Sequence, residues 1–272
     1  MARVCHFCGG SLAGNKSREH VFADWLLEFT GQGDAIVEPT HQNFEGDVVY
    51  HRRNPHTFNG LLLGGVCERP CNNGWMSTID ANAKPALIAL WQGRAAASLL
   101  QHDRHALSVW AAKTTFTLNL SSLSTFRRII PQAHIEALFK NPKVLPPGVL
   151  VIAETGLKND GLGWAQSQSW YAHLEDRETA LCKALEGSSF KTTLRIGPSA
   201  VTTSFWPNDD WMISLRDGRH VMMGSERSLI GWNAAPGYVK SNYDHVEHAF
   251  EIQVLSPATV RAQYGDAPFG VP

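Results

Sequence analysis

The chain lacks any segment suited to crossing a membrane. Its 272 residues contain no uncharged apolar run of the roughly 20 residues that a membrane-spanning helix needs. The best stretch, PALIALWQGRAAASLL, is interrupted by Gln92 and Arg94. Because the chain enters a cysteine pair almost at once, we expect no signal peptide. Because 43% of the residues are hydrophobic and 18% are charged, we expect a soluble globular protein in the cytoplasm.

Cysteine is scarce, and four of the five cysteines fall into two pairs. Cys5 and Cys8 stand in CHFC, Cys67 and Cys71 stand in CERPC, and Cys182 lies alone in LCKAL. Each pair directs two sulfurs toward one point, so the pairs together predict a tetrahedral Cys₄ zinc site. A closed site of this kind is structural, and its reduced thiolates fit a reducing compartment. Cys182 is predicted to be a buried thiol.

Residues suited to chemistry lie between and beside these pairs. Glu19 and His20 are adjacent in SREH, and Asn72 follows the second pair directly. An imidazole can take a proton from water near neutral pH, and a carboxylate with an amide oxygen suits a hard ion such as Mg²⁺. These residue types fit phosphodiester hydrolysis, in which a cation stabilises charge on the scissile phosphate. Since adjacent strand residues point to opposite faces, we expect a local distortion at Glu19 and His20.

Three segments, CHFCGG, SREHVFADWL and VCERPCNNGWMS, carry a resemblance to a known family. Over roughly the first 85 residues, the chain resembles the HNH endonucleases of the ββα-metal class in their four-cysteine form. The resemblance implies a carboxylate-histidine pair on a β-hairpin and a metal ligand where the next helix opens. It makes His20 the general base, and Glu19 and Asn72 the ligands of one Mg²⁺ or Mn²⁺ ion.

The chain departs from the family pattern in two places. Glu19 stands where the family usually has Asp, and three residues instead of two separate Cys67 from Cys71. The middle Asn of the signature stays open among Asn43, Asn54 and Asn59. Residues 30–58 form a polar insert, and three of its histidines are open between solvent exposure and phosphate contact: His41, His51 and His56.

The resemblance implies metal-dependent hydrolysis of DNA with one active site per chain, so that one protomer nicks one strand. Breaking both strands would need a homodimer or two successive events. An HNH enzyme that prefers RNA or branched DNA stays open. So does a protein of another class, a zinc ribbon that binds nucleic acid or a protein partner without catalysis. Family members occur in phage, mobile-element and defence contexts, which the resemblance extends to this chain.

Positive charge is low overall, since the net charge is −1, whereas proteins that hold many phosphates tend to be basic. Residues 1–80 carry six lysines and arginines against nine aspartates and glutamates, but residues 81–130 carry a net charge of +5. This segment is either a phosphate-binding flank or a solvated helix face. The candidates for nucleic-acid binding are Lys84, Arg94, Arg104 and Lys113.

The pattern along the chain predicts an α+β protein in three parts. An HNH-type module spans 1–84, a helical segment spans 85–146, and a mostly antiparallel β domain spans 147–272. We expect one helix over 72–83, capped by Asn72 or Asn73, and three more that begin at Pro85, Asp103 and Pro131.

The last part alternates in short segments that predict strands. These segments are VLVIAE, SQSWYAHL, FKTTLRIG, AVTTSFWP, WMISLR and LIGWN, with a helix at DRETALCKALEG. We find no phosphate loop and no repeat there. The acidic residues Asp209, Asp210 and Asp217 are predicted to belong to turns.

Overall fold

The protein is α+β, as the pattern predicts, and its contacts divide it into two compact units. The first unit comprises Met1–Asp80 and Phe116–Arg128, and the second comprises Ala81–Thr115 and Ile129–Pro272. The expected boundaries after residues 84 and 146 stay predictions. The computed structural model describes residues 3–37, 40–42, 48–51, 56–121, 128–158, 161–167, 171–172, 176, 178–179, 182, 189–207, 212–215, 221–225, 229–231 and 252–264.

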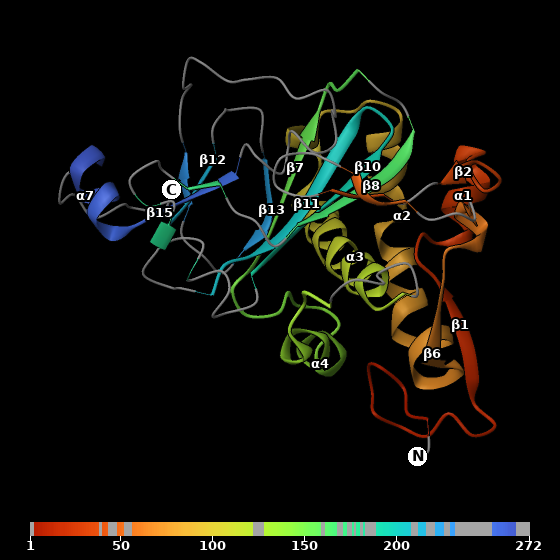
Figure 1. Ribbon diagram of the computed structural model, residues 1–272. Coiled ribbons are helices and arrows are strands. Elements are labelled where there is room, and N and C mark those ends of the chain that lie inside the picture. Colours follow the sequence, from red (N-terminus) through yellow and green to blue (C-terminus); the bar gives the residue numbers. More distant parts are fainter. Residues whose placement is uncertain are drawn as a thin grey trace. The chain divides into compact units, whose positions relative to one another are not determined.

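The first unit is built on a pair of strands followed by a helical segment (Figure 1). β1 pairs antiparallel with β6, although 41 residues separate the end of one from the start of the other. The buried core beside them includes Phe22 and Phe58, whose ring centroids lie 5.5 Å apart. The elements of this unit are β1 (Lys16–His20), α1 (Asp24–Thr30), β2 (Ile36–Val37), β3 (Thr40–Gln42), β4 (Val48–His51), β5 (His56–Thr57), η1 (Phe58–Gly60), β6 (Leu62–Cys67) and η2 (Glu68–Met76).

A bulge interrupts the β1–β6 ladder. Ser17 pairs with Val66, but the next residue, Arg18, pairs with Gly64, so Gly65 is the extra residue on β6. Gly65 has φ +78°, a left-handed conformation that glycine adopts without steric cost. The distortion expected at Glu19 and His20 therefore lies one step earlier, between Ser17 and Arg18.

The second unit joins helices to two sheets. Its first helix, α2 (Ser77–Trp91), begins in the first unit and continues through Pro85. The expectation that a new helix begins at Pro85 was wrong, because a single proline removes one helical hydrogen bond without ending this helix. The remaining helices are η3 (Ala96–Ser98), α3 (Gln101–Leu120), α4 (Gln132–Lys140) and α7 (Pro257–Tyr264).

A five-stranded antiparallel sheet forms the core of the second unit, in the order β13-β7-β11-β10-β8 (Figure 1). One face packs on helices: the His134 ring of α4 contacts Phe190 and Phe205, and Ser199 Oγ donates to the Leu90 carbonyl of α2. The segments VLVIAE, FKTTLRIG and AVTTSFWP were predicted to be strands, and they form β7, β10 and β11. The strands are β7 (Val149–Thr155), β8 (Leu162–Ser167), β10 (Phe190–Ile196), β11 (Ser199–Phe205) and β13 (Val221–Ser225).

A four-stranded sheet, ordered β14-β12-β15-β9, is mixed rather than antiparallel. β12 pairs antiparallel with β15, but β12 with β14 and β15 with β9 run parallel. Its strands are β9 (Tyr171–Ala172), β12 (Met212–Leu215), β14 (Leu229–Gly231) and β15 (Ile252–Leu255). The helix expected over 176–187 and the acidic turn residues Asp209, Asp210 and Asp217 lie largely or wholly outside the described residues.

The other face of the five-stranded sheet is buried although it carries polar residues. Thr193 and Thr202 face each other across β10 and β11 with their hydroxyl oxygens 2.9 Å apart. On the same face of β10, burial lowers the pKa of Lys191 to about 7. In the unfolded chain a lysine keeps its proton up to a pKa of about 10.4. Lys191 therefore lowers the stability of the folded state most at neutral pH and below.

Replacing Lys191 with methionine is expected to stabilise the protein more at pH 7 than at pH 10. Above the unfolded pKa the lysine is neutral in both states, so its penalty disappears there; the penalty grows as pH falls toward 7. Urea denaturation of wild type and Lys191→Met at both pH values measures the difference, with the exposed Lys140→Met as control. An equal gain at both pH values would contradict this account of Lys191.

Among the described residues, no helix is both long enough and apolar enough to cross a membrane.

Candidate metal centre and catalytic residues

The four paired cysteines converge in the first unit. Their sulfur atoms all lie within 4.8 Å of one another, with Cys5 3.7 Å from Cys71 and Cys8 3.6 Å from Cys67. Four sulfurs placed about 2.3 Å from a tetrahedral zinc ion are separated by about 3.8 Å, whereas a disulfide requires about 2.05 Å. The cluster therefore has the donor set and the spacing of a metal site such as a zinc site, and the thiols are free.

Backbone groups hold these sulfurs in place. The Cys67 N–H donates to Cys5 Sγ at 3.4 Å, and the Gly10 N–H donates to Cys8 Sγ at 3.4 Å. The Cys5 N–H in turn donates to the Gly10 carbonyl at 2.8 Å, which closes the first knuckle. Donors aimed at sulfur stabilise thiolates and fix their orientation. The backbone of the two cysteine loops thus fixes the positions of these sulfur atoms.

The pKa values of the cysteines differ. The hydrogen bond between Cys71 and Cys5 lowers the pKa of Cys5 to about 4 and raises the pKa of Cys71. Burial raises the pKa of Cys67. A bound metal ion would take the place of the protons that remain, because thiolates are the ligands of zinc.

We expect protein purified without added metal to contain about one zinc ion per chain. Elemental analysis measures this content, and the absorption spectrum after replacement by Co²⁺ reports whether four thiolates surround the ion. Protein that is metal-free and carries disulfides within this cluster would contradict the assignment.

Side chains of the first knuckle pack on β6 and η2. The Phe7 ring meets Trp75 edge to face at a centroid distance of 5.4 Å, and Met76 is fully buried. The His6 ring lies close to Gly65, and the backbone N–H of His6 donates to the Gly65 carbonyl at 3.0 Å. His6 is half-buried rather than a surface residue, and burial together with the Arg128 charge lowers its pKa. The bulge in β6 is therefore part of the knuckle's support.

Replacing Gly65 with alanine is expected to destabilise the first unit by about 2 to 3 kcal/mol. An added Cβ would lie 2.6 Å from His6 Nε2, and it would also occupy a left-handed conformation. Gly14→Ala is the matched control, since Gly14 has φ +68° but nothing within 4 Å of a Cβ. Thermal unfolding of the zinc-loaded variants measures both. An equal loss for the two variants would remove the His6 contact from this account.

Asn72 is tied to β1 through its side chain. Nδ2 donates to the Arg18 carbonyl at 3.0 Å and to Ser17 Oγ. The sequence predicted that Asn72 or Asn73 caps the helix, and this was wrong, because neither residue stands directly before the regular helix. Asn73 Nδ2 instead donates to Glu68 Oε1 at 3.1 Å. The regular helix starts only at Ser77, after non-helical backbone at Asn73 and Gly74.

A second pair of hydrogen bonds holds the loop between Cys67 and Cys71. Asn15 Nδ2 donates to the Arg69 carbonyl at 2.7 Å, and the Arg69 N–H donates back to Asn15 Oδ1 at 3.1 Å. Asn15 directly precedes β1, and Arg69 lies between the cysteines of the second pair. The cysteine loop is thus held against the strand that carries Glu19 and His20.

Glu19 and His20 occupy the end of β1, opposite Leu63 and Leu62 of β6. The Glu19 side chain is only 4% exposed, whereas His20 is half-buried. Asn72 approaches β1 at the two residues that precede this pair. The structure therefore places the three predicted catalytic residues on adjoining parts of one module, and their catalytic roles stay predictions.

The polar insert is described only in part. Asn59 is exposed on η1, and its Nδ2 donates to Asp34 Oδ1 at 3.2 Å. His56 is half-buried on β5. Asn43 and Asn54 lie outside the described residues, as do the side chains of His41 and His51. The middle Asn of the HNH signature stays open.

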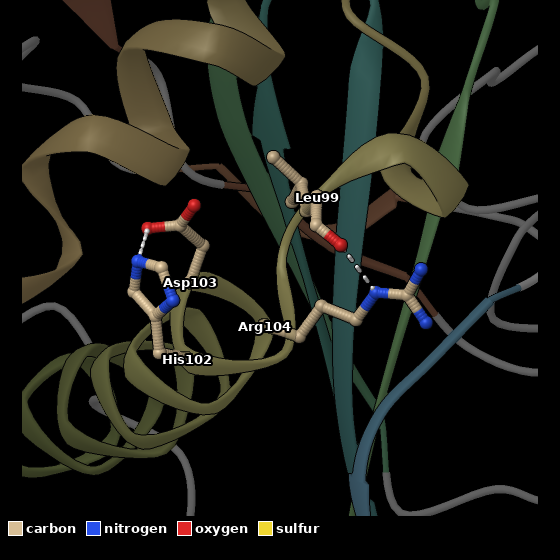
Figure 2. A network of polar contacts seen from close by, with 4 residues as sticks. All are labelled: Leu99, His102, Asp103 and Arg104. Carbon is tan, nitrogen blue, oxygen red and sulfur yellow. Dashed lines mark hydrogen bonds and ion pairs between the residues drawn. The ribbon is translucent and has the colours of Figure 1, made fainter.

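The four basic candidates differ in exposure. Lys113 is fully buried within α3. Its prediction as a nucleic-acid-binding residue was therefore wrong. Figure 2 shows Arg104 turned back toward its own chain, where Nε donates to the Leu99 carbonyl at 2.9 Å. Arg104 Nη2 also donates to the Ala97 carbonyl, which the figure does not draw. Lys84 and Arg94 are exposed. Exposure therefore leaves these two residues as candidates for phosphate contact.

The start of α3 also differs from expectation. The helix begins at Gln101, so Asp103 lies in its first turn instead of capping it. There its carboxylate faces the His102 imidazole at 3.3 Å, as Figure 2 shows, and the His102 side chain is largely exposed. An acidic group in the first turn favours the helix through its dipole, and an exposed pair of this kind contributes little more.

Two features escaped the sequence reasoning. Ser17 contacts Asn72 across 55 residues of chain, and only its position two residues before Glu19 could have drawn attention to it. Cys182 is exposed, so the expectation of a buried thiol was wrong.

The arrangement defines an α+β protein with a four-cysteine cluster in its first unit and an antiparallel sheet in its second. No known protein family, curated protein or solved structure matches the chain.

Proposed function

We propose that the protein is a metal-dependent nuclease of the HNH type that hydrolyses DNA phosphodiester bonds. The observation that carries the proposal is the pair of hydrogen bonds from Asn72 Nδ2 to Ser17 Oγ and the Arg18 carbonyl. These bonds hold Asn72, the residue after the last cysteine of the cluster, against the strand that carries Glu19 and His20. A structural zinc ion would keep the loop of Cys67 and Cys71 in this position.

The proposed roles follow from the chemistry of the side chains. The Glu19 carboxylate and the Asn72 amide oxygen are hard donors of the kind that Mg²⁺ or Mn²⁺ takes, with water filling the other positions. Such an ion supplies stabilisation of the charge on the scissile phosphate. His20 takes the proton from the attacking water, and its half-buried position leaves the imidazole accessible to solvent. One site per chain implies a nick in one strand.

DNA is the proposed substrate, with Lys84 and Arg94 as the candidates for phosphate contact. RNA and branched DNA need the same hydrolysis, so they remain alternatives within the proposal. A homodimer or a protein partner would be needed for a concerted double-strand break. A phage, mobile-element or defence context belongs to the proposal through the family resemblance alone, and the cytoplasm belongs to it through the composition and the reduced cysteines.

One observation favours a second candidate. Glu19 is 4% exposed, and a carboxylate buried so far can serve the fold rather than a metal ion. The protein would then be a zinc ribbon that binds nucleic acid or a protein partner without cleaving. On this alternative, the cysteines remain essential for folding while His20 can be replaced without loss of binding.

The test is a cleavage assay on three substrates: supercoiled plasmid, a four-way DNA junction and single-stranded RNA. Zinc-loaded protein is incubated with Mg²⁺ or Mn²⁺, with EDTA in a parallel sample. The proposal predicts nicked plasmid that appears only with the divalent ion. Cleavage of the junction or RNA alone would change the substrate, and tight binding without cleavage of any substrate would favour the zinc ribbon.

A further inference from the structure

The amide of Asn72 has two chemically different ends, and the structure shows which end faces β1. The Arg18 carbonyl oxygen can only accept a hydrogen bond, so the amide atom 3.0 Å from it must be the nitrogen. The same nitrogen also donates to Ser17 Oγ. Both N–H bonds of the Asn72 amide are thereby directed at two consecutive residues of β1.

This pair of contacts prevents the amide from turning over. A flipped amide would bring Oδ1 against the Arg18 carbonyl, so that two acceptors would face each other and both donated bonds would be lost. The orientation seen directs Oδ1 away from the two atoms that hold Nδ2. Oδ1 is also the only atom of this side chain that can bind a hard cation.

Ser17 and Glu19 lie two residues apart on β1. Side chains two apart on a strand project from the same face, with their Cα atoms about 6.6 Å apart. The burial of β1 agrees, since Ser17 is half-buried and Glu19 buried while Arg18 between them is exposed. The side of β1 that holds the Asn72 amide is therefore also the side from which the Glu19 carboxylate projects.

The bulge at Gly65 lies opposite the step from Ser17 to Arg18. A bulge interrupts the regular ladder of a strand pair. At this interruption a side-chain hydroxyl and a backbone carbonyl both meet one amide from another segment. The Asn72 amide is thus hydrogen-bonded to β1 at the position where the pairing of β1 with β6 is irregular.

We infer that Ser17 is a positioning residue, which orients the Asn72 carbonyl oxygen toward a divalent cation shared with Glu19. This inference rests on the proposed nuclease function. Ser17 does not bind the cation itself, and its hydroxyl acts through the Asn72 amide. Second-layer hydrogen bonds of this kind typically change metal affinity by about 10- to 100-fold when they are removed.

The test compares Ser17→Thr with Ser17→Val, which differ only by a hydroxyl in place of a methyl group. Both β-branched residues suit a strand. Mn²⁺ is titrated into zinc-saturated protein while electron paramagnetic resonance measures the free Mn²⁺. Thiolates prefer zinc to Mn²⁺, so the cysteine cluster stays filled with zinc. Ser77→Ala is a control, since it removes a hydroxyl bonded to the Gly74 carbonyl in the same module.

We expect Ser17→Thr to bind Mn²⁺ like the wild type and Ser17→Val to bind about tenfold more weakly. The Mn²⁺ concentration that gives half-maximal cleavage should rise by the same factor, while the zinc content and the Ser77→Ala control stay unchanged. Equal affinity in the two variants, whether normal or reduced, would overturn the inference, because the hydroxyl would then have no specific role.

Failure of the proposed function gives a different result. Wild-type protein that neither binds Mn²⁺ beyond its zinc nor cleaves any substrate would overturn both proposals. Wild-type protein that binds Mn²⁺ and cleaves, with Ser17→Val equal to it, would overturn the role of Ser17 alone.

Discussion

The His20→Ala variant is expected to cleave DNA about 10²- to 10⁴-fold more slowly than the wild type. The water that attacks the phosphate must lose a proton, and no other group of β1 is proposed to accept it. His20 is half-buried at the end of the strand and pairs with Leu62 in the β1–β6 ladder. The variant should therefore keep its fold and its zinc.

Single-turnover cleavage rates, with Mn²⁺ saturating and the enzyme in saturating excess over the DNA, measure this loss without a contribution from substrate binding. His102→Ala is the matched control, because His102 is largely exposed and lies on α3 rather than in the cysteine module. A His20→Ala rate within threefold of the wild type would remove His20 from the mechanism, and a variant without zinc would point to a structural role instead.

The Cys71→Ser variant is expected to lose its metal and the ordered packing of the first unit. Structural zinc sites contribute on the order of 10 kcal/mol to the folding of small modules. Cys71 is fully buried, lies 3.7 Å from Cys5, and directly precedes Asn72. Its loss would release both the metal and the residue that is held against β1.

Cys182→Ser is the matched control, since Cys182 is exposed and lies outside the cluster. Elemental analysis should find zinc in this control and none in Cys71→Ser. Limited proteolysis should then cleave Cys71→Ser within residues 3–80 while the wild type and the control resist. Full zinc content and protease resistance in Cys71→Ser would contradict the four-cysteine site.

The sequence predicted the features that depend on short-range pattern. Two cysteine pairs with short spacing were enough to predict one cluster, and short segments bounded by turn residues were enough to place β7, β10 and β11. β13 was missed, because Val221–Ser225 contains Gly224 at a register irregularity and lacks a clear alternation. The parallel pairing of β12 with β14 cannot be read from strand pattern at all.

Errors arose where packing decides the outcome. Lys113 was assigned to a basic surface because it stands in a net-positive segment, yet α3 is buried there on all sides, including Thr114, Thr115 and Thr117. A polar run of this kind looks solvated in a sequence. Pro85 suggested a helix start, although α2 runs through it.

The sequence predicted candidate residues for the site, but it did not predict the hydrogen bonds that hold them in place. Glu19, His20 and Asn72 follow from residue type and a family resemblance. The contacts that hold Asn72 and Arg69 join residues 54 or 55 positions apart, so no local pattern could disclose Ser17 or Asn15. These supports are what turn a set of reactive residue types into a testable arrangement.

The most direct test of the account is the nicking of supercoiled plasmid by zinc-loaded wild-type protein and by His20→Ala, with Mn²⁺ present or removed by EDTA. The account predicts nicked circles from the wild type only with Mn²⁺, and almost none from His20→Ala in the same time. Nicking by His20→Ala at the wild-type rate, or nicking that persists in EDTA, would contradict it.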